Sequence, residues 1–194
     1  MKIVHYLTYL FFSFTILVFF ISCKEHYTPK SKGYVKVKYP EKQYIEFDTT
    51  APFTFEYPVY ARVVPDKSPN AEPHWYNIKY PDFNATIYLS YKDVQNNLQA
   101  FIEDSRELAY KHSIKAEAID ESLIRDTSRE VFGIIYDLRG NTASSVQFFT
   151  TDSTEHFLRG SLYFNTQPNR DSLRPVIQFI RKDIIHLIET LRWK

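Results

Sequence analysis

The sequence VFGIIYDLRGNTASSVQFFTTDSTEHFLRGSLYF, residues Val131–Phe164, decides the fold. It contains three stretches in which apolar side chains alternate with polar ones, a pattern typical of β-strands. Gly140 with Asn141, and then the segment Asp152–Thr154, separate these stretches, and such residues favour tight turns. The sequence therefore predicts three consecutive antiparallel strands, and we expect this meander to form the core of the protein.

The two faces of the predicted meander differ less than the faces of a sheet that is open to water on one side. One face of each strand is apolar, with Phe132, Ile134, Tyr136, Leu138, Val146, Phe148, Leu158, Gly160, Leu162 and Phe164. The opposite face mixes Ile135, Ala143, Phe149, Phe157 and Tyr163 with Asp137, Arg139, Ser145, Gln147, Arg159 and Ser161. A sheet with one solvated face separates the two classes more sharply. We therefore expect a helix, a loop or a partner to cover part of that second face.

Length and composition restrict the class of protein. A chain of 194 residues fits one domain and a targeting segment. Aromatic residues make up 17% of the chain, which supports a large core and argues against disorder. The net charge is +1, from 24 basic and 23 acidic residues, so the chain lacks the basic surface of a nucleic-acid-binding protein.

The first residues of the chain predict a targeting segment. Met1 and Lys2 precede an apolar run, Tyr6–Ile21, that ends in Ser22 and Cys23, and Cys23 is the only cysteine. The run is about long enough to span a bilayer, so a retained transmembrane anchor is one interpretation. A small residue directly before a cysteine also resembles the bacterial lipoprotein box. That resemblance implies that residues 1–22 are a cleaved signal peptide and that Cys23 carries acyl chains.

A lipidated Cys23 would fix the location of the protein. Several acyl chains hold a domain firmly on a membrane. No thiol would then remain for a disulfide, a metal site or a nucleophile, and we expect no cofactor besides this covalent lipid. Phe20 stands where the box usually has Leu, which weakens the match. Lys24 stands where many inner-membrane lipoproteins have Asp, so we expect an outer-membrane lipoprotein that faces the periplasm.

The residues before the meander predict a tether and then several strands. Residues 23–45 are rich in Lys, Tyr and Pro and have little to bury, so we expect the lipidated cysteine and a flexible tether there and a single folded domain at 46–194. Alternating apolar residues predict strands over 52–58, 75–80 and 85–91. Prolines predict a loop over 62–73.

Two stretches predict helices. Asp93 is a suitable N-cap for a helix that runs to about His112, with an apolar stripe that Ser105 interrupts. A second helix begins at Asp171 or Ser172 and carries a regular apolar stripe. Its charges are of both signs, so we expect it to pack on the sheet rather than on a membrane surface. Residues between the first helix and the meander form either a short strand or an irregular connection.

The order of these elements predicts the fold class. Strands, a helix, the meander and a closing helix indicate an α+β fold, in which an antiparallel sheet of about six strands is packed by two main helices. The entry segment Phe55–Pro58 and this element order also resemble the sandwich of PsbP-type domains. That resemblance concerns the fold and carries no function.

Four segments resemble the gliding motility lipoprotein GldD family of the Bacteroidota. They are GNTASSVQFFTTDSTEHFLRGSLYFN at 140–165, DSLRPVIQFIRKDIIHLIETLRWK at 171–194, YPDFNATIYLSYK at 80–92 and FEYP at 55–58. The resemblance implies an envelope lipoprotein that is required for gliding along surfaces. It also implies a link to other gliding proteins and to the type IX secretion system that drives this motility. Cys23 is the only functional position that the resemblance carries over.

The sequence gives little support to an enzyme. Asp152, Ser153, Glu155 and His156 are neighbours on a turn and a strand, where adjacent side chains point to opposite faces. The chain has no nucleophile-elbow motif, its six histidines lack the spacing of metal ligands, and its 4 glycines form no phosphate-binding loop. We therefore expect no catalytic residue and no metal site.

A binding and assembly role agrees best with these observations. Such scaffolds usually carry recognition residues on loops. The candidate partner-binding residues are Asn141, Thr142, Asp152, Arg159 and Asn165. The alternative is a periplasmic module that binds a glycan or a small molecule through Trp75 and Tyr76, although such aromatic residues also form cores.

Overall fold

The computed structural model describes His5 and residues 38–111, 116–166 and 170–194. The chain divides into two compact units, Met1–Lys36 and Val37–Lys194, and the description below concerns the second unit. Cys23 and most of the predicted tether lie outside the described residues. Within the described ranges, no helix is both long enough and apolar enough to cross a bilayer.

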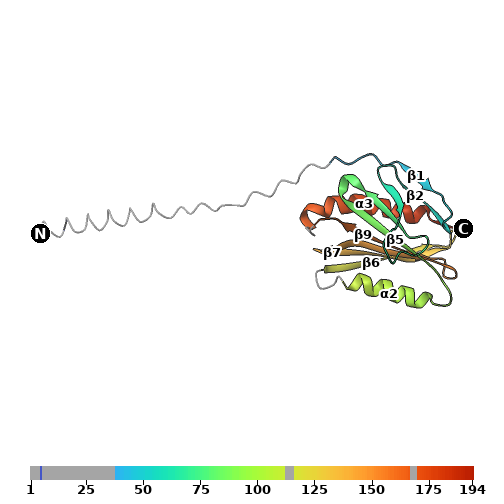
Figure 1. Ribbon diagram of the computed structural model, residues 1–194. Coiled ribbons are helices and arrows are strands. Elements are labelled where there is room, and N and C mark those ends of the chain that lie inside the picture. Colours follow the sequence, from blue (N-terminus) through green and yellow to red (C-terminus); the bar gives the residue numbers. More distant parts are fainter. Residues whose placement is uncertain (1–4, 6–37, 112–115, 167–169) are drawn as a thin grey trace. The chain divides into compact units, whose positions relative to one another are not determined.

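A seven-stranded antiparallel sheet forms the centre of the second unit (Figure 1). Its strands lie in the order β3-β4-β5-β9-β8-β7-β6. Their bounds are β3 (Arg62–Pro65), β4 (Tyr76–Tyr80), β5 (Ala85–Asp93), β6 (Ala116–Asp126), β7 (Val131–Gly140), β8 (Ser144–Thr151) and β9 (His156–Phe164). The predicted meander is β7-β8-β9, and β5 pairs along the whole length of β9.

A second, smaller sheet and the helices complete the unit. The three-stranded sheet has the order β1-β2-β10, with β1 (Tyr44–Phe47), β2 (Phe53–Pro58) and β10 (Arg192–Trp193). The helices are η1 (Pro81–Phe83), α2 (Leu98–Tyr110) and α3 (Arg170–Thr190). Figure 1 shows α3 and the small sheet on one face of the main sheet and α2 on the opposite face. The prediction of an α+β fold with an antiparallel sheet and two main helices is confirmed.

The larger core lies between the main sheet and the layer of α3 and the small sheet. The apolar stripe of α3 supplies Ile180, Ile184 and Leu187, and strand residues close the other side, with Phe53, Phe55, Ile87, Leu158 and Leu162. Gly160 makes room for the ring of Phe148, because a Cβ on residue 160 would lie 2.2 Å from two ring carbons. Burial of these aliphatic and aromatic side chains is the main stabilising contribution to the fold.

A second core lies under α2 on the opposite face of the sheet. It is formed by Ala109, Tyr136, Leu138, Phe149 and Phe157. Ile135 of β7 pairs with Phe148 of β8, so the alternating residues of β7 that include Tyr136 face α2. Phe148 and Leu158, which were predicted to share a face with Tyr136, lie in the larger core with α3 instead. The predicted assignment of faces is therefore wrong for β7: α2 covers the mixed face at Phe149 and Phe157, whereas Ile135 packs in the core with α3.

Several boundaries differ from those predicted. β1 begins at Tyr44, before the predicted domain start at residue 46, because Tyr44 donates a hydrogen bond to Asp183 of α3. β3 occupies part of the predicted loop, since Val63 pairs with Ile78 across to β4. Each of these contacts joins residues far apart in sequence, which local periodicity does not report.

The connection around α2 also differs. Asp93 is the last residue of β5 and pairs with His156 of β9, so α2 begins later, at Leu98. The ambiguous segment before the meander is a strand, β6, which pairs with β7 along its length. The strand interpretation of that segment is therefore the correct one.

Candidate functional site

The face of the main sheet that carries α2 is only partly covered by this helix. α2 packs on the apolar part of the face through the second core. Beside it, Tyr88 of β5 keeps 46% of its surface exposed. Two pockets adjoin at this residue, with volumes of about 840 and 340 Å³. We call these two pockets together the outer groove.

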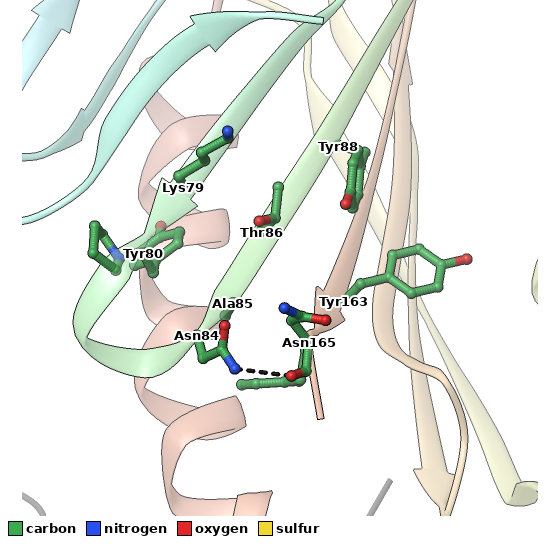
Figure 2. A pocket seen from close by; sticks show the side chains of 10 residues that line it. Lys79, Tyr80, Asn84, Ala85, Thr86, Tyr88, Tyr163 and Asn165 are labelled. Carbon is green, nitrogen blue, oxygen red and sulfur yellow. Dashed lines mark hydrogen bonds between the residues drawn. The ribbon is translucent and has the colours of Figure 1, made fainter. Parts of the chain in front are cut away.

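The first pocket of the outer groove lies where β5 begins and β9 ends (Figure 2). Asn84 and Asn165 close this end, because the Asn84 side-chain amide donates to the Asn165 carbonyl at 2.8 Å and the Asn165 backbone N–H donates to the Asn84 carbonyl at 2.9 Å. Asn84 adopts a left-handed conformation with φ 47°, which Asn tolerates better than most residues. Tyr88 and Tyr163 meet edge to face at 5.7 Å, and Lys79 lines the pocket beside them.

The second pocket lies between α2 and β5. Phe101, Ser105 and Leu108 of α2 form one wall, so the serine that interrupts the apolar stripe lines the pocket. Trp75 forms part of the other wall and donates from its indole Nε1 to the Tyr91 carbonyl at 2.9 Å. The Lys92 ammonium lies over the Trp75 ring, 5.4 Å from its centre, so one face of this ring already has a neighbour.

Arg159 lines the second pocket from the middle of β9. Its guanidinium donates to Oε1 of Gln147 at 2.5 Å. Among the described residues, no carboxylate forms an ion pair with it. Burial lowers the pKa of the Arg159 guanidinium, and the nearby Tyr163 phenol opposes this shift. Because an arginine keeps its proton in proteins, Arg159 places in the groove a positive charge that has no ion-pair partner among the described residues.

A row of polar residues crosses the sheet at Tyr88. Asn77, Tyr88, Ser161 and Gln147 are successive register partners on β4, β5, β9 and β8. Gln147 and Ser161 are only 1% and 2% exposed. Within the described part of the chain, Asn77 Oδ1, Ser161 Oγ and Gln147 Nε2 are buried without a hydrogen-bond partner. Buried polar atoms are nearly always paired in folded proteins, so this cluster beside the groove is unusual.

The structure brings together two of the five residues predicted to bind a partner. Arg159 and Asn165 both line the outer groove. Ser144 pairs with Tyr163, so Asn141 and Thr142 lie at the same end of the sheet as Asn165, but outside the residues that line the groove. Asn141 is exposed there. Thr142 is buried, and its hydroxyl donates to the Ser144 carbonyl at 2.9 Å.

Asp152 lies at the opposite end of the sheet. Thr151 pairs with Phe157 there, and the length of β9 separates the two ends by about 26 Å. The Asp152 carboxylate accepts hydrogen bonds from the backbone N–H groups of Thr154, Glu155 and His156, so it holds the β8–β9 turn. Arg159 is three residues after His156 in β9, so the Asp152 turn lies about 10 Å from it along the strand, but outside the residues that line the groove.

Sequence reasoning missed several residues of the groove. Lys79 and Tyr88 lie in predicted strands, and their outward direction became visible only with the sheet register. Gln147 and Ser161 were recognised as polar residues of the mixed face. Of the two predicted stacking residues, Trp75 lines the groove, whereas Tyr76 packs against Phe47 and Phe53.

The described residues also hold one cluster of titratable groups near the start of β9. The Tyr91 hydroxyl lies 2.8 Å from Nδ1 of His156 and 2.9 Å from Asp93. Burial, and then Asp93, raise the pKa of the Tyr91 phenol, so this hydroxyl keeps its proton at neutral pH and is a poor nucleophile. No group of three or more potential metal ligands occurs in the described ranges.

Comparison with known proteins gives one family. The family described as "Gliding motility lipoprotein GldD" matches residues 24–193. No match is found among curated proteins. Among solved structures, the chain is similar to the solution structure of cyanobacterial PsbP (CyanoP) from Synechocystis sp. PCC 6803, with a TM-score of 0.48 and 10% sequence identity. That similarity covers 80% of this chain and 95% of the other.

Proposed function

Because the chain belongs to the gliding motility lipoprotein GldD family, we propose that this envelope lipoprotein supports gliding as a binding and assembly component rather than as an enzyme. The family match covers nearly all residues after Cys23, so the folded unit is the part that the family shares. The component would act within the multiprotein machinery that joins type IX secretion to motility.

The anchor in this proposal is the lipid on Cys23. Its acyl chains would hold the chain on the outer membrane, with the folded unit in the periplasm. Lys24 stands where many inner-membrane lipoproteins have Asp, which supports the outer membrane as the location. The residues between Cys23 and Val37 would give the folded unit reach toward a partner.

The single observation that carries the binding role is the uncompensated charge of Arg159 in the outer groove. A half-buried charge without an ion-pair partner lowers stability, so its presence favours a use outside the fold. Asn165, at the end of the same strand, offers a side-chain amide to the same groove. A partner that contacts both residues would be held on a rigid antiparallel sheet.

The test is complementation of an in-frame deletion strain. We expect Arg159→Ala with Asn165→Ala to abolish surface spreading, while the protein stays at its wild-type level in the envelope. Lys182→Ala is the matched control, because Lys182 is an exposed cation on α3, on the opposite face of the sheet. The secreted-protein profile of each strain shows whether secretion fails together with spreading. A stable double variant that spreads normally would rule out the outer groove as the contact surface.

A glycan- or small-molecule-binding module is the second candidate. The observation in its favour is that Trp75 lines the outer groove beside Tyr88. Binding of peptidoglycan fragments by the purified protein, lost in Trp75→Ala, would support this candidate. Absence of binding at millimolar fragment concentration would remove it.

A further inference from the structure

Among the described residues, little of the hydrogen-bonding capacity of Arg159 is used. A guanidinium has five N–H donors in a planar fork, and Gln147 accepts from one nitrogen, Nη2. Asp66 and Asp104 line the same pocket, but neither forms an ion pair with Arg159. A planar carboxylate matches two parallel donors of the fork and supplies the missing negative charge.

A buried residue orients this guanidinium. Gln147 accepts the Arg159 bond at its Oε1 atom, is only 1% exposed, and lies outside the residues that line the two pockets. The other guanidinium donors have no acceptor among the described residues. A ligand oxygen atom is an acceptor, so Arg159 favours an anion over a cation.

The aromatic residues of the groove favour a protein segment over a sugar. Sugar binding needs an open aromatic face, but Lys92 covers a face of Trp75, and the Trp75 indole N–H is already bonded to the backbone of Tyr91. Tyr88 is packed edge to face with Tyr163. These rings therefore act as fixed walls rather than as stacking platforms.

The shape of the groove fits an extended chain. The lining residues follow β5 from Ala85 to Lys92, a length of about 23 Å, which equals about seven residues of extended chain. Asn84 and Asn165 close one end with side-chain amides that can bond a backbone. Lys79 adds an exposed positive charge to the first pocket, and no described carboxylate forms an ion pair with it.

We propose that the outer groove binds an extended, acidic segment of a partner protein, and that Arg159, oriented by its bond to Gln147, receives the carboxylate of one Asp or Glu side chain of that segment. This inference rests on the proposed assembly role and gives the class of its ligand. Arg159 is the residue that selects the carboxylate, and the two pockets on either side of Tyr88 hold the flanking residues.

Binding is measured with the full-length, lipid-anchored protein in detergent. The chain has 2 Trp residues, so Trp193→Phe leaves Trp75 in the groove as the only fluorescent indole. The probe is a capped heptapeptide whose only charge is a central glutamate, and its counterpart has glutamine there. We expect the glutamate peptide to bind at least about tenfold more tightly, with a change in Trp75 fluorescence. This preference should weaken at high salt.

Variants of Arg159 test the role of its side chain. Arg159→Met should abolish the preference for glutamate, and Arg159→Lys should retain only part of it, because an ammonium keeps the charge but loses the planar fork. Arg181 is the matched control, since its guanidinium already forms two bonds to Asp137, at 2.6 and 2.7 Å. Arg181→Met should leave the preference unchanged.

Thermal unfolding separates a binding role from a structural one. A structural arginine loses stability when it is replaced, and Arg181→Met should lower the Tm. Arg159→Met removes a half-buried charge that has no counter-ion, but also the bond to the buried Gln147 Oε1 atom, so its Tm should fall clearly less than that of Arg181→Met. A fall in the Tm of Arg159→Met as large as that of Arg181→Met would assign Arg159 to the fold and overturn the proposal.

Three other results would also overturn it. They are equal binding of the two peptides, a glutamate preference that survives Arg159→Met, and tighter binding of glucuronate than of the glutamate peptide. The last result would move the site to an acidic sugar. Peptide binding tests the ligand of the groove, whereas surface spreading tests the assembly role, so the two proposals can fail separately. If the wild-type groove shows no glutamate preference but the Arg159→Met strain fails to spread, only this inference is removed. If the wild-type groove shows the preference but the Arg159→Met strain spreads normally, only the assembly role is removed.

Discussion

Asp183 shows how a single buried carboxylate positions the start of the folded unit. It lies on α3, is 2% exposed, and accepts hydrogen bonds from Lys42 Nζ at 2.5 Å and from the hydroxyls of Tyr44 and Tyr60 at 2.9 and 2.8 Å. Burial lowers the pKa of the Lys42 ammonium, and the contact with Asp183 opposes that shift. Burial, followed by the bond to Asp183, raises the pKa of the Tyr60 phenol. The network therefore ties the first described residues of the unit to α3.

Asp183→Asn tests this network. The substitution leaves the Lys42 charge without its partner, and breaking a buried ion pair in this way usually costs 3 kcal/mol or more. We expect a loss of about 3 kcal/mol, at the low end of that range because the Lys42 side chain is 27% exposed. Urea unfolding measures the loss. The exposed neighbour Lys182→Ala should stay within about 0.5 kcal/mol of the wild type. An equal, small effect of both changes would contradict the structural role of Asp183.

Asp152 gives a prediction about pH. Burial alone would raise the pKa of its carboxyl, but N–H bonds from His156, Thr154 and Glu155, with the Thr154 hydroxyl, hold this pKa below its ordinary value of 3.8. A carboxyl with a lowered folded pKa stabilises the fold above the unfolded pKa, and this contribution disappears as the pH falls through the folded pKa. Asp152→Asn should therefore cost about 1 kcal/mol at pH 7, after allowance for solvent screening.

The same comparison at acid pH completes the test. The difference in unfolding free energy between the wild type and Asp152→Asn should shrink as the pH falls below 3.8. Chemical unfolding of both proteins across this range measures it. A difference that stays constant with pH would mean that the charge of Asp152 does not act in the turn.

At the scale of elements, the pairing of β7 with β8 depends on a glycine. A Cβ on Gly133 would lie 1.9 Å from the backbone carbonyl oxygen of Phe149, which is part of the neighbouring strand. The same residue, Phe149, contributes its phenyl ring to the second core beneath α2. A side chain at residue 133 would therefore separate the two strands and disturb the contact with α2.

Gly133→Ala should consequently destabilise the protein by more than about 2 kcal/mol, because the new methyl group meets backbone and not a flexible side chain. Differential scanning calorimetry gives the change in Tm. Ser122→Ala is the control, since Ser122 is exposed on the edge strand β6 and should change stability little. A tolerated alanine at residue 133 would mean that β7 and β8 adjust without loss of pairing.

Elements with strong local periodicity were predictable, and elements fixed by remote partners were not. The meander and α3 follow from alternation and from the helical stripe. The start of α2 was misplaced, because Asp93 is a good helix cap in sequence but pairs with His156 in the sheet. Lys42 was assigned to the tether, because its partner Asp183 is 141 positions away in the sequence.

The candidate site shows the same limit. Asn165 was predicted as a residue of a polar loop, and Arg159 as a polar residue on the mixed face of the third strand. That Arg159 lacks a carboxylate, and that Gln147 lies beside it, depends on the register of β8 against β9. Sequence patterns set which residues are polar, whereas the register sets which of them meet. Tyr88 lines the groove for the same reason, because its register partners are Asn77 and Ser161.

At the scale of the whole molecule, the cover on the main sheet is unequal. α3 and the small sheet cover one face, and α2 covers the part of the other face formed by β7, β8 and the start of β9 (Figure 1). The outer groove lies on the remaining part, over β4, β5 and β9. A partner bound there would contact a preorganised sheet, so binding would cost little conformational entropy on this side of the interface.

The anchor supplies the last prediction. If acyl chains on Cys23 hold the protein, Cys23→Ala should move it from the membrane fraction to the soluble envelope fraction, and spreading should fail although the outer groove is intact. Fractionation and spreading assays on complemented deletion strains measure both effects. Ser22→Ala is the control, because alanine is also a small residue before the cysteine. A Cys23→Ala protein that stays in the membrane and supports spreading would instead identify the apolar run Tyr6–Ile21 as a retained anchor, since a run of that length can nearly span a bilayer without lipid.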